Sequence, residues 1–263
     1  LAHAEVLPFP FFVRGDDVTF SLANDFRLAP ILGVSSQQED FTVKRSPLTA
    51  YLDARYHVVQ QLAHETLDPS PEAIRGQLGF LFHGWNDTCH YASAAAVLQA
   101  VEDVAEGPEF WDRDPELRER RAQMREEGAE EIPKPGLEYP LDGVAVVDPK
   151  KHTDPFHQWL RKISNNGHKL PDRMFYTRAG FFPLSTRAGP HQTFLRRELY
   201  FMDDASGLGY RLRLSRERHA ANLARLETAW AKLSAALPEL RRAYRGARPE
   251  LVSEAAWRRR LGI

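Results

Sequence analysis

Apolar residues recur at helical spacing through residues 46–106. Residues 46–65 carry one every three or four positions, behind a Ser46-Pro47 pair that suits the start of a helix. The same spacing returns in 71–84 and in 89–106, where Gly107-Pro108 is expected to end the helix. The pattern predicts antiparallel helices that bury Leu52, Tyr56, Val59, Leu62, Leu78, Phe80, Leu81, Ala95 and Leu98.

Shorter apolar runs predict strands. Phe9 to Val13 is aromatic and β-branched, which favours a buried strand, and residues 27–34 favour a second strand that Pro30 confines to a sheet edge. Residues 195–214 predict a β-hairpin, expected as an accessory element. One face of it would be basic, facing either plain solvent or an anionic lipid surface or neighbouring subunit, through Arg196, Arg197, Arg211 and Arg213.

The remaining segments are mostly helical in pattern. Residues 111–131 are a charge run, which we interpret as a solvated helix. Ser215 is placed to cap a long helix, broken or kinked at Pro238, and a last short helix carries Trp257. Residues 132–190 are rich in proline, glycine and histidine and predict no clear element. The order indicates an α/β fold class: a piece of α/β structure, then a largely helical region with a hairpin.

Composition narrows the function classes. The chain has 263 residues, 43% of them hydrophobic, enough for one large or two small domains with a sizeable core. A net charge of −1 makes no general electrostatic case for nucleic acid. The single cysteine excludes an internal disulfide and a multi-cysteine metal site, and fits a reducing compartment. No apolar run reaches the ~20 residues that span a bilayer.

Two adjacent carboxylates, Asp16 and Asp17, follow Gly15 at the start of a helix expected over residues 18–23. In one interpretation Asp16 caps that helix and Asp17 favours its first turn. In the other, the pair stands at the carboxyl end of a strand, where open α/β sheets bind ligands. A carboxylate placed there could take a proton from a sugar hydroxyl. Local sequence leaves both interpretations open.

Histidines are the other candidate chemistry. His83-Gly84-Trp85-Asn86 is similar to the oxyanion turn of an α/β-hydrolase, but the chain has no Gly-x-Ser-x-Gly nucleophile elbow. Two pairs stand seven residues apart without another ligand at metal spacing, which favours packing over zinc: His57 with His64, and His83 with His90. A loop-rich stretch could bind phosphate or an anionic acceptor through His152, His157, His168, Lys162 and Arg173.

Three stretches in order, PFFVRGDDVTFSL, ILGVSSQQEDF and KRSPLTAYLDARYH, resemble the second half of a family 2 inverting glycosyltransferase of the bacterial galactofuranosyltransferase-like kind. AVLQAVEDVAEGPEFW and PELVSEAAWRRRLGI are similar to later segments of that family. The resemblance runs from residue 8 to the end, thinly between 110 and 190. It implies that residues 1–45 are the C-terminal remnant of a GT-A (nucleotide-diphospho-sugar transferase) catalytic domain, and 46–263 a helical C-terminal region.

The resemblance also implies roles for residues. In the family, one of the paired acids is the catalytic base, which deprotonates the acceptor hydroxyl as it attacks the anomeric carbon with inversion. That role comes to Asp17, or failing that to Asp16. The residues expected to bind substrate are Arg14, Gly15, Arg55 and His57.

A divalent metal, Mn²⁺ or Mg²⁺, belongs to the family. Its histidine ligand, in a Trp-His-Glu type motif, aligns with Gln38, and a neutral amide is a poor ligand for either ion. The candidate metal residues are Gln38, at the aligned position, and Glu39; Glu39 or Asp40 could take the place of Gln38 after a small shift. The family commonly has an acid two residues after the pair, where this chain has Thr19.

The implied partners are a nucleotide-sugar donor and a glycan acceptor, and a homo-oligomer is a further expectation. The family's donor-binding half and its Asp-x-Asp motif precede the paired acids, so we expect a missing N-terminal half or a partner chain to supply them. The expected location is the cytoplasm, peripheral at the inner face of the plasma membrane, where a cell-surface polysaccharide would be built. The alternative is a non-catalytic scaffold or binding module that keeps the remnant fold.

Overall fold

The computed structural model describes residues 6–11, 14–24, 26, 33, 45–64, 67, 69–138, 143–148, 150–186, 188–203 and 205–263. Its α-helices are α1 (Asp16–Ala23), α2 (Pro47–Ala63), α3 (Pro71–Asn86), α4 (Tyr91–Val104), α5 (Phe110–Arg113), α6 (Arg118–Glu127), α7 (Pro155–Ile163), α8 (Pro190–Thr193), α9 (Arg216–Leu251) and α10 (Glu254–Leu261). A 3₁₀ helix, η3, covers Asp172–Met174. The strands are β1 (Lys134–Pro135), β2 (Val144–Val146), β3 (Ala179–Pro183), β4 (Glu198–Asp203) and β5 (Leu208–Arg213).

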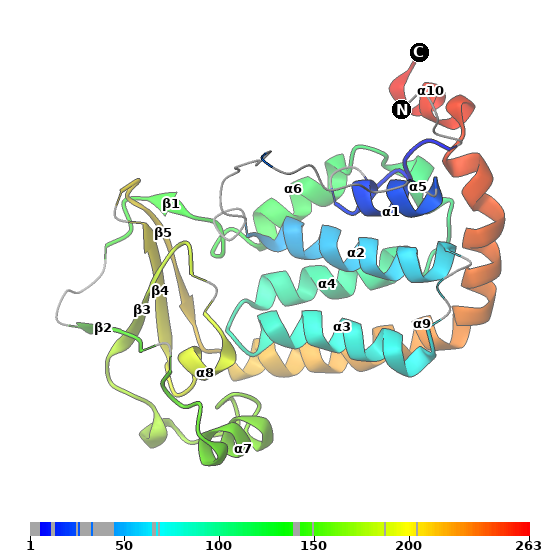
Figure 1. The fold of residues 1–263 in the computed structure, drawn as a ribbon. Coiled ribbons are helices and arrows are strands. Elements are labelled where there is room, and N and C mark those ends of the chain that lie inside the picture. Colours follow the sequence, from blue (N-terminus) through cyan, green and yellow to red (C-terminus); the bar gives the residue numbers. More distant parts are fainter. Residues whose placement is uncertain are drawn as a thin grey trace.

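Four helices form the helical body: α2, α3 and α4 lie side by side, and α9 runs along them (Figure 1). Local sequence explains why α2 and α3 begin where they do. The Ser46 hydroxyl accepts from the Thr49 amide while the Thr49 hydroxyl accepts from the Ser46 amide, and Ser70 caps α3. These helices confirm the predicted elements at 46–65, 71–84 and 89–106. The predicted core positions are buried or half-buried except Phe80, which is 69% exposed because it lies on the outer face of α3.

The long helix predicted after Ser215 is confirmed, and Ser215 accepts a hydrogen bond from the amide of Arg218 at its start. Pro238 lies inside α9, which stays helical through it to Leu251. Proline has no N–H to donate to the preceding turn, so a bend is expected there rather than an end. Figure 1 shows α9 changing direction partway along its length. None of the helices in the described ranges is long and apolar enough to cross a bilayer.

A five-stranded mixed sheet in the order β1-β5-β4-β3-β2 lies at one end of the helical body (Figure 1). β4 and β5 pair antiparallel, which confirms the predicted hairpin, while β3 runs parallel to β4 and to β2. The hairpin therefore lies at the centre of this sheet. Its expected role as an accessory to a catalytic sheet stays a prediction, because the second strand expected near the paired acids lies outside the described residues. Residues 132–190, which predicted no element, supply β1, β2 and β3.

The expected basic face of the hairpin is only partly present: Arg197 and Arg213 are exposed, Arg211 is half-buried and Arg196 is buried. The side chains of Arg211 and Arg213 donate to Glu198 at 2.6 and 3.0 Å. Arg196 is 5% exposed and donates to the backbone oxygen of Arg178. Arg197 pairs with Asp172 at 3.1 Å. These four arginines are largely neutralised or buried by neighbours that the strand pattern does not reveal.

The N-terminal region differs from its prediction. Phe9 to Phe11 are not in a strand, although Phe9 and Phe11 are buried, and the helix expected over 18–23 is confirmed as α1. Isolated extended chain needs a neighbouring strand to pair with, and here the two aromatic rings find a helical core instead. The second strand expected over 27–34 lies outside the described residues, apart from Gly33.

The charge run at 111–131 is not a uniformly solvated helix. It is divided between α5 and α6, and it buries Leu117, Met124 and Glu131. The Glu131 carboxylate accepts from the amides of Ala92 and Ser93, and so caps α4, whose own N-cap side chain makes no such bond. The acid is thus a structural part of the helical body.

Candidate functional site

The segment that leads to the paired acids is held against the helical body. The rings of Phe9 and Phe11 lie 5.0 and 5.6 Å from that of Trp111, edge to face. Arg55, on α2, donates from its guanidinium to the backbone oxygen of Phe11. From the far end of the chain, the Trp257 indole donates to the backbone oxygen of Pro8 at 2.9 Å. The entry to α1 is therefore fixed on both sides.

Gly15 sets the direction in which α1 leaves. It is the N-cap of the helix, with φ of 77°, a left-handed conformation that favours glycine. A Cβ at this position would overlap the ring of Tyr56 on α2. The close approach of the Gly15 backbone to Tyr56 thus requires glycine for two independent reasons.

Asp16 and Asp17 form the first turn of α1, where unpaired helix N–H groups favour carboxylates. Asp16 is half-buried and Asp17 is exposed. The prediction that Asp16 caps the helix is wrong, because the N-cap is Gly15 and no side chain bonds there. Asp17 instead accepts from the next amide, that of Val18, at 2.8 Å. The Asp17 side chain is otherwise exposed to solvent.

Of the four expected substrate-binding residues, two directly precede this turn and two lie on α2. Gly15 and Arg14 lie directly before it, and Arg14 pairs with Asp53 on α2 at 3.0 Å. Arg55 is 2% exposed and contacts the carbonyl of the docked segment, so it positions the site from inside. His57 turns toward α3, where its Nδ1 lies 2.9 Å from the side-chain Nε2 of Gln77.

Electrostatics link Asp17 to α2. Burial raises the pKa of Tyr56, and the nearby negative charge of Asp17 adds to the rise. The Tyr56 phenol therefore stays protonated at neutral pH beside the carboxylate. The arrangement offers an exposed carboxylate as proton acceptor, held by a helix start, with Arg14 and Tyr56 as neighbours.

The candidate metal residues Gln38 and Glu39 lie outside the described residues, as does Asp40. Within the part that the structure describes, no group of three or more His, Cys, Asp or Glu side chains could hold a metal ion. The prediction of a metal site at Gln38 and Glu39 therefore stays a prediction.

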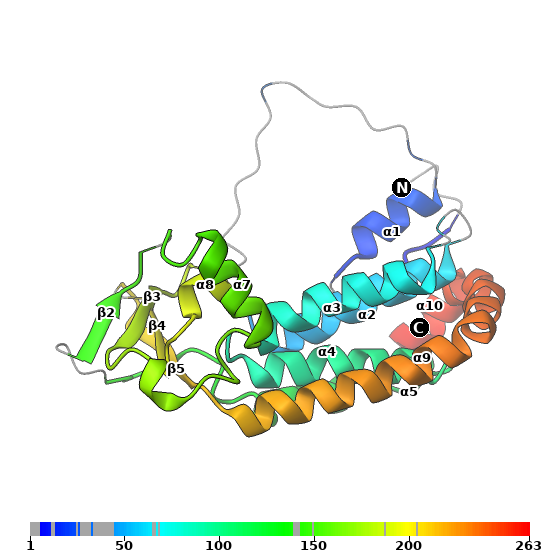
Figure 2. The ribbon, with the colours of Figure 1, turned by 90° about the horizontal axis from the view of Figure 1, so that it is seen from below.

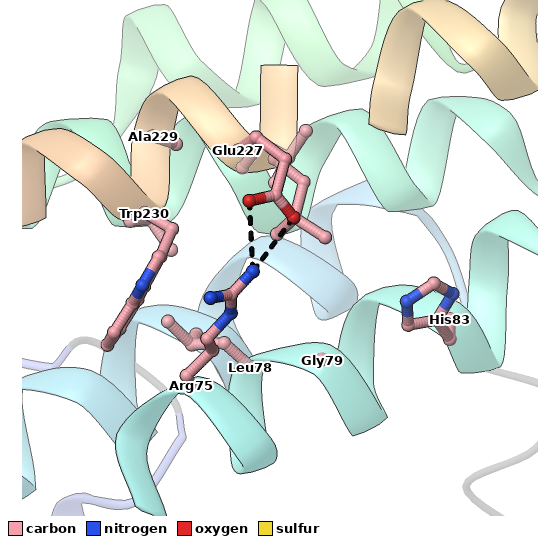
Figure 3. A pocket seen from close by; sticks show the side chains of 10 residues that line it. Arg75, Leu78, Gly79, His83, Glu227, Ala229 and Trp230 are labelled. Atoms are coloured by element: carbon pink, nitrogen blue, oxygen red, sulfur yellow. Dashed lines mark hydrogen bonds and ion pairs between the residues drawn. The ribbon is translucent and has the colours of Figure 1, made fainter. Parts of the chain in front are cut away.

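A small cavity lies between α3 and α9, with a volume of about 120 Å³. Figure 3 shows Arg75 and Glu227 meeting across it, with Trp230 at one side and His83 at the other. Arg75 donates to both carboxylate oxygens of Glu227, at 2.9 and 3.0 Å. Ligand pockets are commonly ~300–1,000 Å³, so this cavity is too small for a sugar nucleotide.

A larger groove of about 810 Å³ runs beside η3 and the edges of β3, β4 and β5. Four arginines and two acids line it: Arg173, Arg178, Arg197, Arg213, Asp172 and Glu198. Both acids are already paired with arginines. Within the described residues the side chains of Arg173 and Arg178 have no acidic partner, so the groove favours an anionic ligand.

A buried polar cluster joins the sheet end to the helices. Asp87, in the turn after α3, lies 3.0 Å from Nε2 of His219 on α9 and 3.3 Å from Nδ1 of His83. The ring of His168 stacks on that of His219, with centroids 3.8 Å apart. Asn86, fully buried, donates to the backbone oxygen of His219. Because these groups bond one another, the cluster connects the sheet end to the helices and does not form an open site.

Burial opposes the charge of Asp87, but the hydrogen bonds from His219 and His83 outweigh it and lower the pKa of Asp87 to about 2. Burial, and then the neighbouring His219, lower the pKa of His168 to about 4. The pairing of histidines seven apart did not predict this cluster. The signal in the sequence was His83 and Asp87 at i and i+4, whereas His168 and His219 come from distant segments.

Comparison with protein-family models and with curated proteins found no match to this chain.

Replacing Gly15 with alanine should release α1 from α2. A left-handed residue with a Cβ costs roughly 1–2 kcal/mol, and the overlap with Tyr56 adds to that. Limited trypsin digestion should therefore cleave at Arg14 faster in Gly15→Ala than in the wild type. The control is Gly76→Ala within α3, where an added Cβ meets no atom. Equal cleavage rates in all three proteins would contradict the docking of this segment.

Stability should depend on pH through His168. Its folded pKa of about 4 lies below the ordinary 6.5, so the unfolded chain takes up a proton first as the pH falls. The stabilisation from neutral His168 is complete above 6.5 and is lost between 6.5 and 4. By urea unfolding, the advantage of wild type over His168→Gln should shrink by roughly 1–2 kcal/mol from pH 7 to 5. A constant difference across that range would show that folding does not lower the pKa of His168, and would contradict the prediction.

Proposed function

We propose that this chain is the acceptor-side part of an inverting glycosyltransferase, with Asp17 as the base for the acceptor hydroxyl. The observation that carries the proposal is an exposed carboxylate in the first turn of α1, on a segment docked to α2. The order of sequence stretches that resembles galactofuranosyltransferase-like enzymes supports it independently. The GT-A fold expected for those enzymes is part of the same proposal.

The chemistry needs one well-placed base. The acceptor O–H proton passes to the Asp17 carboxylate, and the oxygen attacks the anomeric carbon of the donor sugar. The bond to the nucleoside diphosphate breaks, and the leaving group takes its electron pair. A single displacement forms no covalent intermediate, so the configuration inverts. Asp16, half-buried in the same turn, would orient the base and the acceptor.

The local geometry suits this role. A helix start stabilises a carboxylate in its charged, proton-accepting form. Gly15 and the buried Arg55 fix where that carboxylate stands, since both hold the chain before α1 against α2. Accurate placement of the reacting groups supplies much of an enzyme's rate enhancement. Arg55 is therefore proposed as a positioning residue, and Arg14 as the residue nearest the acceptor.

The donor and the metal belong to the rest of the proposal. A nucleotide sugar would be held by a further half of the enzyme, in the same polypeptide or in a partner chain. A divalent ion, where one is used, would assist departure of the diphosphate. The cytoplasmic side of the plasma membrane is the proposed place of action, with a glycan of the cell surface as acceptor.

Asp17→Asn should abolish most transfer in the complete enzyme, donor half included. Asparagine keeps the size of the side chain but cannot accept the proton, and general-base catalysis is worth ~10²–10⁴-fold. Stability should change by less than ~1 kcal/mol, because Asn and Asp are similarly tolerated at helix starts. Asp16→Asn is the matched control and should cost less activity. The measurements are sugar transfer and urea unfolding on the same preparations.

The alternative, a non-catalytic binding module, is favoured by a different observation: the arginine-lined groove beside η3, which lies on the sheet rather than at Asp17. The same assay separates the two. Near-normal transfer by Asp17→Asn, together with a loss of stability, would make the paired acids structural. That result would exclude Asp17 as the base, whereas the binding-module interpretation requires that the wild type transfers no sugar and binds an anionic ligand in the groove.

A further inference from the structure

Helix α7 carries its apolar side chains on the wrong face for a helix that packs on a protein core. Phe156, Trp159 and Ile163 recur at i, i+3 and i+7, and they are 62%, 55% and 48% exposed. A surface helix of a globular protein normally turns such a stripe inward. The Phe156 and Trp159 rings lie together, with centroids 6.1 Å apart. The exposed stripe is therefore one continuous aromatic and aliphatic patch.

The inward face of α7 carries His157 and Leu160, both half-buried, and ends at its C-cap Ser164. The His157 ring lies 4.5 Å from that of His152, which is buried, and Ser164 is 2% exposed. Ser164 accepts a hydrogen bond from the amide of Gly167, so it is used in the fold. The helix is thus held at its inward face and contacts α8: Figure 1 shows α7 at the lower edge of the molecule, and Figure 2 shows it beside α8. The outward apolar face has no covering segment within the described residues.

The surroundings of this patch are basic. Residues 150–173 hold six Lys or Arg side chains and two acids, in a chain whose net charge is −1. Both acids are occupied: Asp154 caps α7 and bonds His157, and Asp172 pairs with two arginines. Lys162 and Lys169 are exposed and have no acidic partner within the described residues. Positive charge is therefore concentrated around the apolar stripe.

We propose that α7 is a membrane-binding helix, which lies in the headgroup region of an anionic lipid bilayer. Phe156, Trp159 and Ile163 would enter the boundary between headgroups and acyl chains. Lys162 and Lys169 would meet the lipid phosphates. Aromatic residues on one side of a short helix with flanking lysines are typical of such interfacial helices. Two copies of this chain pairing through the same face would bring like charges together, which favours lipid over a second copy.

The proposal does not depend on glycosyl transfer. The proposed lipid contact is made by α7 and not by the hairpin arginines, which are paired with acids or buried. Because the apolar stripe of α7 is already exposed, the helix can rest on the bilayer without any change in the fold. The surface would bring the chain to the membrane by itself.

The test is co-sedimentation with vesicles of phosphatidylcholine, with and without phosphatidylglycerol. The wild type should bind the anionic vesicles and should bind the neutral ones more weakly. The double variant Phe156→Ser, Trp159→Ser should bind at least tenfold more weakly, because affinity scales with the apolar area inserted. Lys162→Gln with Lys169→Gln should lose about fivefold for each lysine on anionic vesicles alone. Phe80→Ser is the control, since Phe80 is 69% exposed on another helix and should not alter binding.

Circular dichroism and thermal unfolding on each variant should match the wild type, since the replaced side chains are exposed. The proposal is overturned if the wild type ignores anionic vesicles, or if the aromatic double variant binds them as well as the wild type does. It is equally overturned if light scattering shows a wild-type dimer that the double variant dissolves while neither protein binds vesicles. That result would make α7 an interface between copies.

Discussion

One buried charge organises the helical body: the guanidinium of Arg55, which is 2% exposed in the middle of α2. An isolated charge in a protein interior is costly, so its surroundings must compensate it. The rings of Trp111 and Tyr51 face it at 4.6 and 5.5 Å, and the carbonyl of Phe11 accepts from it. Burial still lowers the pKa of Arg55, which shows the cost of placing it there.

The compensation reaches further than the immediate neighbours. The Tyr51 hydroxyl donates to Asp103, a fully buried acid on α4, at 2.7 Å. Asp103 in turn accepts from Arg120 of α6 at 2.6 and 2.8 Å. On the other side, the Trp111 indole reaches the hydroxyl of Tyr244 on α9. Five helices, α2, α4, α5, α6 and α9, are thereby linked by side-chain contacts around the Arg55 guanidinium.

The same cation decides what happens to the N-terminal segment. Phe11 offers a backbone carbonyl that Arg55 needs, so the stretch before α1 is drawn onto α2. Gly15 then fits against Tyr56, and the first turn of α1 projects Asp16 and Asp17 from a fixed base. Burial of the Arg55 charge is unfavourable by itself, but its guanidinium binds the segment before α1, in which Phe9 to Phe11 form no strand.

Much of the helical body could be predicted from sequence, since caps and apolar spacing are local signals. Ser46, Ser70 and Ser215 begin helices as expected, and the hairpin strands follow their alternating pattern. The failures concern long-range partners. Phe9 and Phe11 have the composition of a strand, yet whether a strand forms depends on a neighbour elsewhere in the chain.

The same reason limits the candidate site. Nothing near Arg55 in the sequence shows that it would be buried beside Trp111, and the resemblance implies only that it binds substrate. The hairpin arginines looked free because Glu198 lies on the same strand pair at positions that only the register brings together. The Asp16 and Asp17 turn was predictable because glycine before two acids is a local feature, whereas its attachment to α2 was not.

Whether Arg55 holds the segment bearing the paired acids is tested most directly by amide hydrogen exchange in Arg55→Lys. Lysine keeps the charge but lacks the planar group that contacts Phe11 and the rings of Trp111 and Tyr51. We expect amides of Thr19 to Asn24 to exchange at least tenfold faster in the variant, while those around Leu98 in α4 keep their protection. Unchanged exchange in α1 would contradict this role of Arg55.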